Sequence, residues 1–113
     1  MAALFGDKAF MGWIKSVSQS ATLTAVCGGT LVLGTAGFLS GKRATTHPAL
    51  MPYLIRLTQF PLDERIVDEG NVITARGVTS AIDLGLYLCE KIAGKEAREK
   101  IQQQMDDHTY CCE

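Results

Sequence analysis

One cysteine, Cys27, stands where a short β-prone segment meets a pair of glycines, and this arrangement could present a nucleophilic thiol. Residues 22–26 read Thr-Leu-Thr-Ala-Val, and Gly28 and Gly29 follow the cysteine. Small residues two positions before and after the thiol are what the tight strand-to-helix turn of a nucleophile elbow requires. The free N–H groups at the start of a following helix favour a thiolate there. We therefore predict that Cys27 is a nucleophile.

Two other interpretations of this stretch stay open. Free cysteines are among the most buried residue types, so Cys27 can instead be a core residue followed by a glycine hinge. Residues 16–41 carry no charged side chain, which makes a membrane span the second alternative. Threonines and glycines interrupt that stretch, and it contains no sustained run of Leu, Ile or Phe. A span is therefore the weaker alternative.

The bulk composition limits the function classes. The 113 residues allow one domain with a modest core, and 47% hydrophobic with 20% charged residues is typical of a soluble globular protein. A formal net charge of −1 indicates neither a nucleic-acid surface nor a basic membrane patch. The four cysteines do not resemble a secreted disulfide framework, and no signal peptide is evident. We expect a cytoplasmic protein without a cofactor, acting on a small molecule.

The segments around the thiol predict the elements that position it. Asp7 caps a helix over residues 7–18, and a helix over 29–39 follows the thiol and ends at Ser40-Gly41. The first helix has an apolar stripe that should face a core, formed by Phe10, Trp13, Ile14 and Val17. Further segments predict a strand over 43–46, a short helix over 49–57, and strands over 64–68 and 71–75 joined by a tight turn.

The last third of the chain predicts two helices and a tail. Ser80 begins a helix over 81–93 that is apolar on more than one face, so we expect it to be heavily buried with Cys89 in the core. A helix over 95–105 follows Gly94, and residues 106–113 should form a frayed tail. The tail contains His108, Cys111 and Cys112, but no second ligand cluster completes a site, so we predict no metal. Alternating strands and helices predict an α/β fold with a largely parallel sheet.

Five segments are informative in combination. They are AVCGG at 25–29, LVLGTAGFL at 31–39, RATTHP at 43–48, DERIVDEGNVITARG at 63–77 and TSAIDLGL at 79–86. Together they resemble the second half of the ThiJ/PfpI superfamily, closest to its isonitrile hydratase-like branch, over residues 10–105. The resemblance implies a flavodoxin-like, class I glutamine amidotransferase-like α/β sandwich, truncated to its C-terminal half. Residues 1–105 would form this partial domain.

The resemblance also implies a site. Cys27 becomes the reactive thiol, His47 in the Thr-Thr-His segment lies near it, and Arg76 and Gly77 border the site. In isolation, a histidine in this position would more often be a capping or surface residue. Gly28 departs from the family pattern at the position after the nucleophile. The peptidase and glyoxalase-like branches have a histidine there that serves as base, and isonitrile hydratases usually have a threonine.

The family's acidic partner for the thiol belongs to the first half of the fold, and this chain resembles only the second. A parallel sheet normally has both faces covered, so the missing strands and helices should leave apolar surface exposed. We therefore expect a homo-oligomer, or a partner that supplies the missing half, and impaired activity in the chain alone.

Two functions are possible. The first is that of a hydratase or hydrolase, in which the Cys27 thiolate attacks an electrophilic carbon of an isonitrile or reactive carbonyl compound. The Gly28 amide would hold the developing negative charge, and His47 would orient or relay a proton. In the second, the chain is a non-catalytic redox sensor or ligand-binding module, including the sensor half of a transcription regulator.

Overall fold

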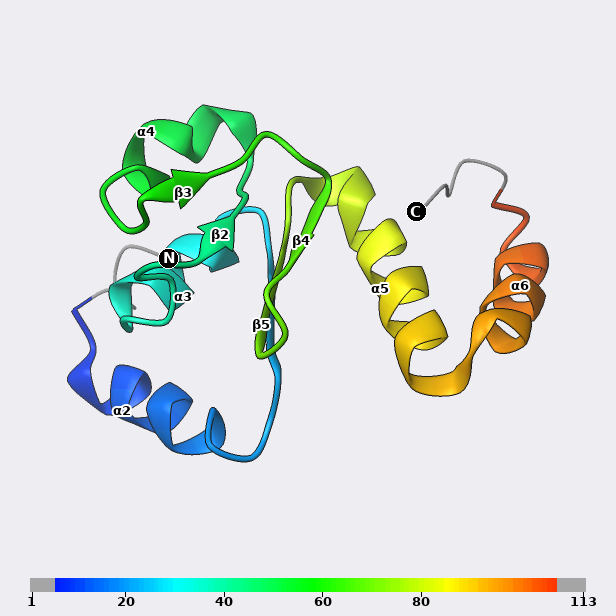
Figure 1. Ribbon diagram of the computed structural model, residues 1–113, viewed down its shortest axis with the longest axis horizontal. Helices are drawn as coiled ribbons and strands as arrows, with labels where there is room; N and C mark the ends of the chain where they lie inside the picture. The colour runs from blue at the N-terminus through cyan, green and yellow to red at the C-terminus, as the bar shows by residue number, and fades with distance from the viewer. Residues whose placement is uncertain (1–5, 108–113) are drawn as a thin grey trace.

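Helices lie on both faces of a three-stranded sheet in the computed structural model, which describes residues 6–107 (Figure 1). The sheet has β5 (Val72–Ala75) at its centre, β1 (Leu23–Val26) parallel to it on one side and β4 (Ile66–Asp68) antiparallel on the other. A separate parallel pair joins β2 (Arg43–Ala44) to β3 (Phe60–Pro61). The fold is mixed α/β: two of the three strand pairings are parallel, and the antiparallel one joins β4 to β5 through the predicted tight turn at Gly70.

The helices follow the predicted order. They are α2 (Lys8–Val17), α3 (Gly29–Thr35), the 3₁₀ turn η1 (Pro48–Leu50), α4 (Met51–Leu54), α5 (Val78–Ala93) and α6 (Lys95–Gln104). The Asp7 side chain accepts a hydrogen bond from the Phe10 N–H at 3.0 Å, which confirms the predicted cap of the first helix. Gly94 has a φ of 97° and separates α5 from α6, as predicted. In the described residues, no helix has the length and apolarity needed to cross a membrane.

Strand β5 divides the core into two parts because successive side chains point to opposite faces of a sheet. Val72 packs with α2, α3 and α4 through a cluster that contains Ile14, Leu31 and Leu54. Ile73 and Ala75 pack on the other face with residues of α5, among them Leu84. All four residues of β5 are buried, as expected for a central strand covered on both sides.

Two helix ends differ from the predictions. Helix α3 ends at Thr35 rather than near residue 39, because Gly37 adopts a φ of 94° and the Phe38 N–H donates to the Leu33 carbonyl at 3.0 Å. Helix α5 begins at Val78 rather than at residue 81. Ser80 therefore lies within the first turn instead of capping it.

The expected burial of the apolar stripes was only partly right. Ile14 of α2 is buried, but Trp13 is 60% exposed, so the predicted stripe faces the core along one edge only. Helix α5 was expected to be heavily buried, yet Ile82 is 50% and Ile92 is 84% exposed. Cys89 is half-buried rather than deep in the core. These side chains lack a covering element in the described part of the chain.

Candidate functional site

The backbone of Cys27 makes a sharp turn between β1 and α3. Its φ is 55°, a left-handed conformation that is uncommon for a residue other than glycine. The Cys27 N–H donates to the Ala75 carbonyl at 3.0 Å, so the turn continues the pairing of β1 with β5. The thiol-bearing residue is half-buried, and Gly28 is buried at the start of α3. Strand, left-handed turn and helix thus follow one another, as the sequence predicts.

A buried threonine joins this turn to the segment that carries His47. The Thr46 hydroxyl donates to the Cys27 carbonyl at 2.6 Å, and Thr46 is fully buried. The His47 Nδ1 accepts a hydrogen bond from the Ala49 N–H at 3.1 Å. In a neutral ring this bond assigns the proton to Nε2, which leaves a donor available on the other side of the imidazole. His47 is therefore both a capping residue and a residue next to the thiol turn.

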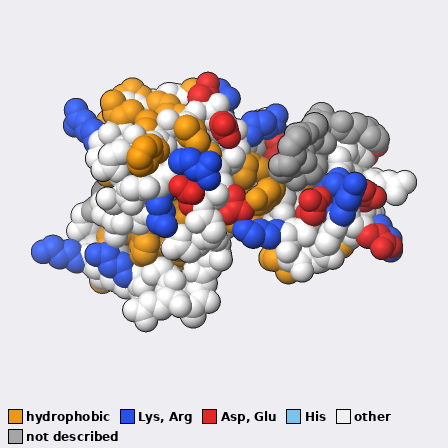
Figure 2. All heavy atoms as spheres, in the orientation of Figure 1, with side chains coloured by type: hydrophobic (Ala, Val, Ile, Leu, Met, Phe, Trp, Pro, Cys, Tyr) orange, Lys and Arg blue, Asp and Glu red, His pale blue; other side chains and the backbone are white. Residues whose placement is uncertain are grey.

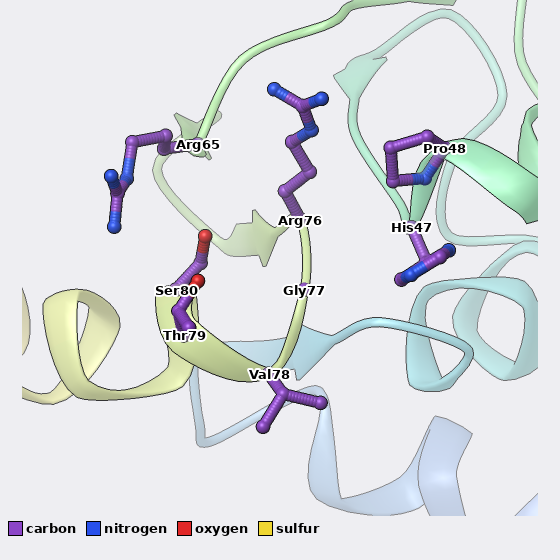
Figure 3. Close-up of a pocket in the computed structure, with 8 residues that line it drawn as sticks. All are labelled: His47, Pro48, Arg65, Arg76, Gly77, Val78, Thr79 and Ser80. Atoms are coloured by element: carbon purple, nitrogen blue, oxygen red, sulfur yellow. The ribbon is translucent and has the colours of Figure 1, made fainter.

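A cavity of about 400 Å³ lies beside this turn (Figure 3). His47 and Pro48 line one side of it, and Arg65 and the segment from Arg76 to Ser80 line the rest. His47 is close to Gly77, because a Cβ added at position 77 would lie 3.7 Å from the His47 Cδ2. The structure thus brings together three of the predicted site residues: His47, Arg76 and Gly77. Cys27 and Gly28 are not among the lining residues, but Cys27 is hydrogen-bonded to Ala75, the residue before Arg76.

Five lining residues were not predicted as part of the site: Pro48, Arg65, Val78, Thr79 and Ser80. The β4–β5 hairpin brings Arg65 next to Arg76, since Ile66 pairs with Ala75 and the Arg76 N–H donates to the Arg65 carbonyl at 3.0 Å. The hairpin itself was predicted. Its strand pairing, which places Arg65 beside the predicted site residue Arg76, was the signal that could have identified Arg65. The early start of α5 brings Thr79 and Ser80 to the cavity.

Each arginine of the cavity has a carboxylate partner. Arg65 pairs with Asp83, whose side chain is only 7% exposed, and the Arg76 Nη1 lies 3.1 Å from Asp63 Oδ1. An arginine side chain has five N–H donors, so one such contact leaves others for a ligand. Asp83 lies in α5, so its pairing with Arg65 connects the hairpin to this helix.

The hairpin is fixed to α5 by Asp68. Its Oδ2 accepts hydrogen bonds from Tyr87 Oη at 2.5 Å and from Lys91 Nζ at 2.7 Å, and its Oδ1 accepts one from the Gly70 N–H. Burial alone would raise the pKa of Asp68, but the bonds from Lys91 and Tyr87 outweigh it and the pKa lies below its ordinary value. These bonds hold the hairpin that carries both arginines against the helix that lines the cavity.

No group of three or more candidate metal ligands occurs among residues 6–107. His108, Cys111 and Cys112, the residues weighed for a metal site, lie outside the described residues. The described part of the chain has two free cysteines, Cys27 and Cys89.

Comparison with known proteins gives one consistent result. The model of the DJ-1/PfpI family matches residues 3–91. An isonitrile hydratase of Pseudomonas putida is 39% identical over 104 residues, which cover 91% of this chain and 46% of that protein. The glutathione-independent glyoxalase DJ-1 of Schizosaccharomyces pombe is 34% identical over 80 residues, or 71% of this chain and 41% of that protein.

A solved structure agrees with these relatives. The crystal structure of a ThiJ/PfpI family protein from Pseudomonas syringae superimposes with a TM-score of 0.88 at 29% identity, over 96% of this chain and 46% of that one. The architecture around β1 and β5 is therefore part of a flavodoxin-like fold. The chain spans about half the length of the relatives that it matches.

Proposed function

Because the chain belongs to the DJ-1/PfpI family, we propose that it carries the cysteine half of an enzyme that hydrates or hydrolyses a small electrophilic compound. The main support is the backbone of Cys27, which has a φ of 55° between a strand and a helix. A nucleophile elbow holds its residue in this strained conformation so that the reactive atom projects from the turn. The names of two relatives support an isonitrile or a reactive carbonyl compound as the substrate.

The proposed reaction begins at the thiolate of Cys27. It adds to the terminal carbon of an isonitrile while that carbon gains a proton, which gives a thioimidate. Water then adds to the same carbon and the C–S bond breaks, so that a formamide leaves and the thiol is restored. A carbonyl substrate would instead form a thiohemiacetal, whose oxyanion the Gly28 N–H would stabilise. Among the described residues this N–H has no hydrogen-bond partner, which supports that role.

His47 is the proposed proton carrier. Its Nδ1 is occupied by the Ala49 N–H, so Nε2 is the atom through which a neutral ring would donate a proton. The bond from Thr46 to the Cys27 carbonyl keeps this segment close to the thiol turn. Arg76 and Gly77 border the same cavity and would limit where the substrate lies.

We also propose that the outer edge of β1 is covered by a polypeptide that corresponds to the remaining part of a DJ-1/PfpI domain. In the described residues β1 pairs on one side only, with β5. The Leu23 and Cys27 N–H groups donate toward β5, so those of Thr24 and Val26 face the open edge. An open parallel edge is a template for another strand. A second copy of this chain is the competing occupant.

Exposed apolar side chains support such a partner. The large ones in the described residues are Trp13, Tyr53, Ile55, Phe60, Val78, Ile82, Ile92, Ile101 and Met105. Figure 2 shows hydrophobic atoms gathered at the upper left of the molecule, over α4 and β3, where Tyr53, Ile55 and Phe60 are each more than half exposed. Surface of this kind is typical of a protein interface. Free thiols at Cys27 and Cys89 agree with a reducing compartment, and we propose the cytoplasm.

The test combines thiol reactivity with turnover. In a variant with Cys89, Cys111 and Cys112 changed to serine, we expect iodoacetamide to modify Cys27 faster than it modifies the same protein unfolded in urea. We expect slow conversion of an aryl isonitrile or of methylglyoxal by the chain alone, which Cys27→Ser should abolish and Cys89→Ser should retain. Equal alkylation rates in the folded and unfolded protein would contradict an elbow in this chain. Turnover that survives Cys27→Ser would exclude the thiol as nucleophile.

A further inference from the structure

We propose that the cavity at the start of α5 binds an oxyanion, the carboxylate or phosphate group of the substrate. This inference deepens the proposed function, because it names a charged group that the electrophilic substrate would carry beside its reacting carbon. Residues with four kinds of donor line the cavity: the hydroxyl of Ser80, the backbone amides of Val78 and Thr79, two arginines and the imidazole of His47 (Figure 3).

The hydroxyl of Ser80 is the first observation. Ser80 is only 4% exposed, it lines the cavity, and its hydroxyl makes no hydrogen bond to another described residue. In Figure 3 its oxygen points into the space between Arg65 and Arg76. The Ser80 oxygen is not one of the fully enclosed polar atoms of the described residues, so it is open to the cavity, where a negatively charged ligand oxygen could accept its proton in a charge-assisted hydrogen bond.

The helix start is the second observation. Helix α5 has 16 residues, and Gly77 before it supplies no side-chain cap. The Ser80 N–H bonds back to the Gly77 carbonyl, which leaves the N–H groups of Val78 and Thr79 without partners in the described structure. Free N–H groups and the positive end of the helix dipole both favour a negative ligand at this place.

The charged side chains that line the cavity are Arg65 and Arg76, which suit an anion rather than a cation. Arg76 contacts Asp63 and Arg65 contacts Asp83, so each positive charge has a carboxylate partner before a ligand binds. The Asp83 side chain is only 7% exposed, whereas the Asp63 side chain is 75% exposed. An incoming oxyanion can therefore replace the exposed Asp63 on Arg76 at little cost, because exposed ion pairs contribute little. Guanidinium groups suit carboxylate and phosphate oxygens equally.

The test measures binding in a protein that has no reactive thiol. We would titrate the Cys27→Ser chain with acetate, with inorganic phosphate and with acetamide, a neutral molecule of the same shape as acetate, while recording backbone amide NMR signals. Acetate or phosphate should shift the signals of Val78, Thr79 and Ser80 in a saturable way, and acetamide should not. The stronger of the two anions identifies the group that the substrate carries.

Variants then assign the binding to the site. Ser80→Ala should weaken anion affinity about tenfold, the effect of losing one hydrogen bond to a charged group. Arg76→Gln should weaken it as well, while Ser16→Ala on the exposed face of α2 should leave it unchanged. Equal shifts with acetamide, unsaturated shifts, or an affinity that Ser80→Ala does not alter would overturn the proposal. Because Cys27 is absent from this experiment, such a failure leaves the proposed chemistry of the thiol standing.

Discussion

The hydroxyl of Thr46 lies 2.6 Å from the carbonyl oxygen of Cys27, so the segment with His47 is bonded directly to the turn with the thiol. The two residues are 19 positions apart, in the turn after β1 and in the segment between β2 and η1. A second buried contact strengthens the connection, since the Thr45 N–H donates to Thr74 Oγ1 of β5 at 3.0 Å. The relative position of thiol and imidazole therefore depends on buried threonines.

Removal of the Thr46 hydroxyl should loosen this connection. Thr46→Val has the same shape but no donor, and we expect it to lower the free energy of unfolding by about 1 kcal/mol. Urea denaturation measures this change, and the NMR signals of the His47 ring should move with it. Thr46→Ser keeps the donor and should leave the ring signals in place. Identical ring signals in wild type and Thr46→Val would contradict a positioning role.

Two glycines in helices should respond oppositely to a methyl group. A Cβ on Gly34 would lie 2.6 Å from Leu57 Cδ1 and 2.9 Å from Leu57 Cβ, so Gly34→Ala should destabilise the fold by about 1–3 kcal/mol. Gly12 of α2 has no atom within 4 Å of that position, and Gly12→Ala should stabilise by about 0.5–1 kcal/mol through helix propensity. Thermal unfolding of both variants tests the pair, and a stabilising Gly34→Ala would show that the packing of α3 against Leu57 is wrong.

The contribution of Asp68 should depend on pH in a defined direction. Because the pKa of Asp68 is lowered in the folded state, the ionised carboxylate stabilises the fold at pH values above its unfolded pKa, and the effect is lost as the pH falls through the folded pKa. The stability difference between wild type and Asp68→Asn should be about 1–2 kcal/mol at pH 7 and should shrink below about pH 4.

A surface ion pair supplies the control for Asp68. Glu96 lies 3.3 Å from Lys100 and is 86% exposed, so Glu96→Gln should change stability by less than about 0.5 kcal/mol at pH 7. Urea denaturation at a series of pH values measures both variants. An Asp68→Asn difference that stays constant from pH 7 to pH 3 would mean that the hydrogen bonds of Asp68 do not depend on its charge.

Blocking the open edge of β1 should prevent association. The Thr24 N–H faces away from β5, so Thr24→Pro removes a donor for an added strand and none of the bonds to β5. Thr24→Val keeps the N–H and is the matched control. Analytical ultracentrifugation should show concentration-dependent association for wild type and Thr24→Val, and less for Thr24→Pro. A complex that forms equally with Thr24→Pro would place the interface elsewhere, such as at the exposed side chains of α4 and β3.

Local sequence patterns determined much of this protein. The small residues around Cys27 required a tight turn, the glycine at position 70 between two β-prone runs required a hairpin, and Asp7 marked a helix start. Each of these depends on backbone conformations and hydrogen bonds within a few residues, which the sequence specifies directly. The combination of segments was also sufficient to place the chain in its family.

Only the tertiary structure decided which residues line the cavity near the thiol turn. Arg65 and Ser80 reach this cavity because a hairpin register and a helix start bring distant residues together, and no sequence pattern predicted either of them as a site residue. The exposure of Trp13 and Ile92 shows the same limit, since an apolar stripe predicts a buried face but not which element covers it. Burial is a property of the packed elements together, whereas a turn or a cap is a property of a few consecutive residues.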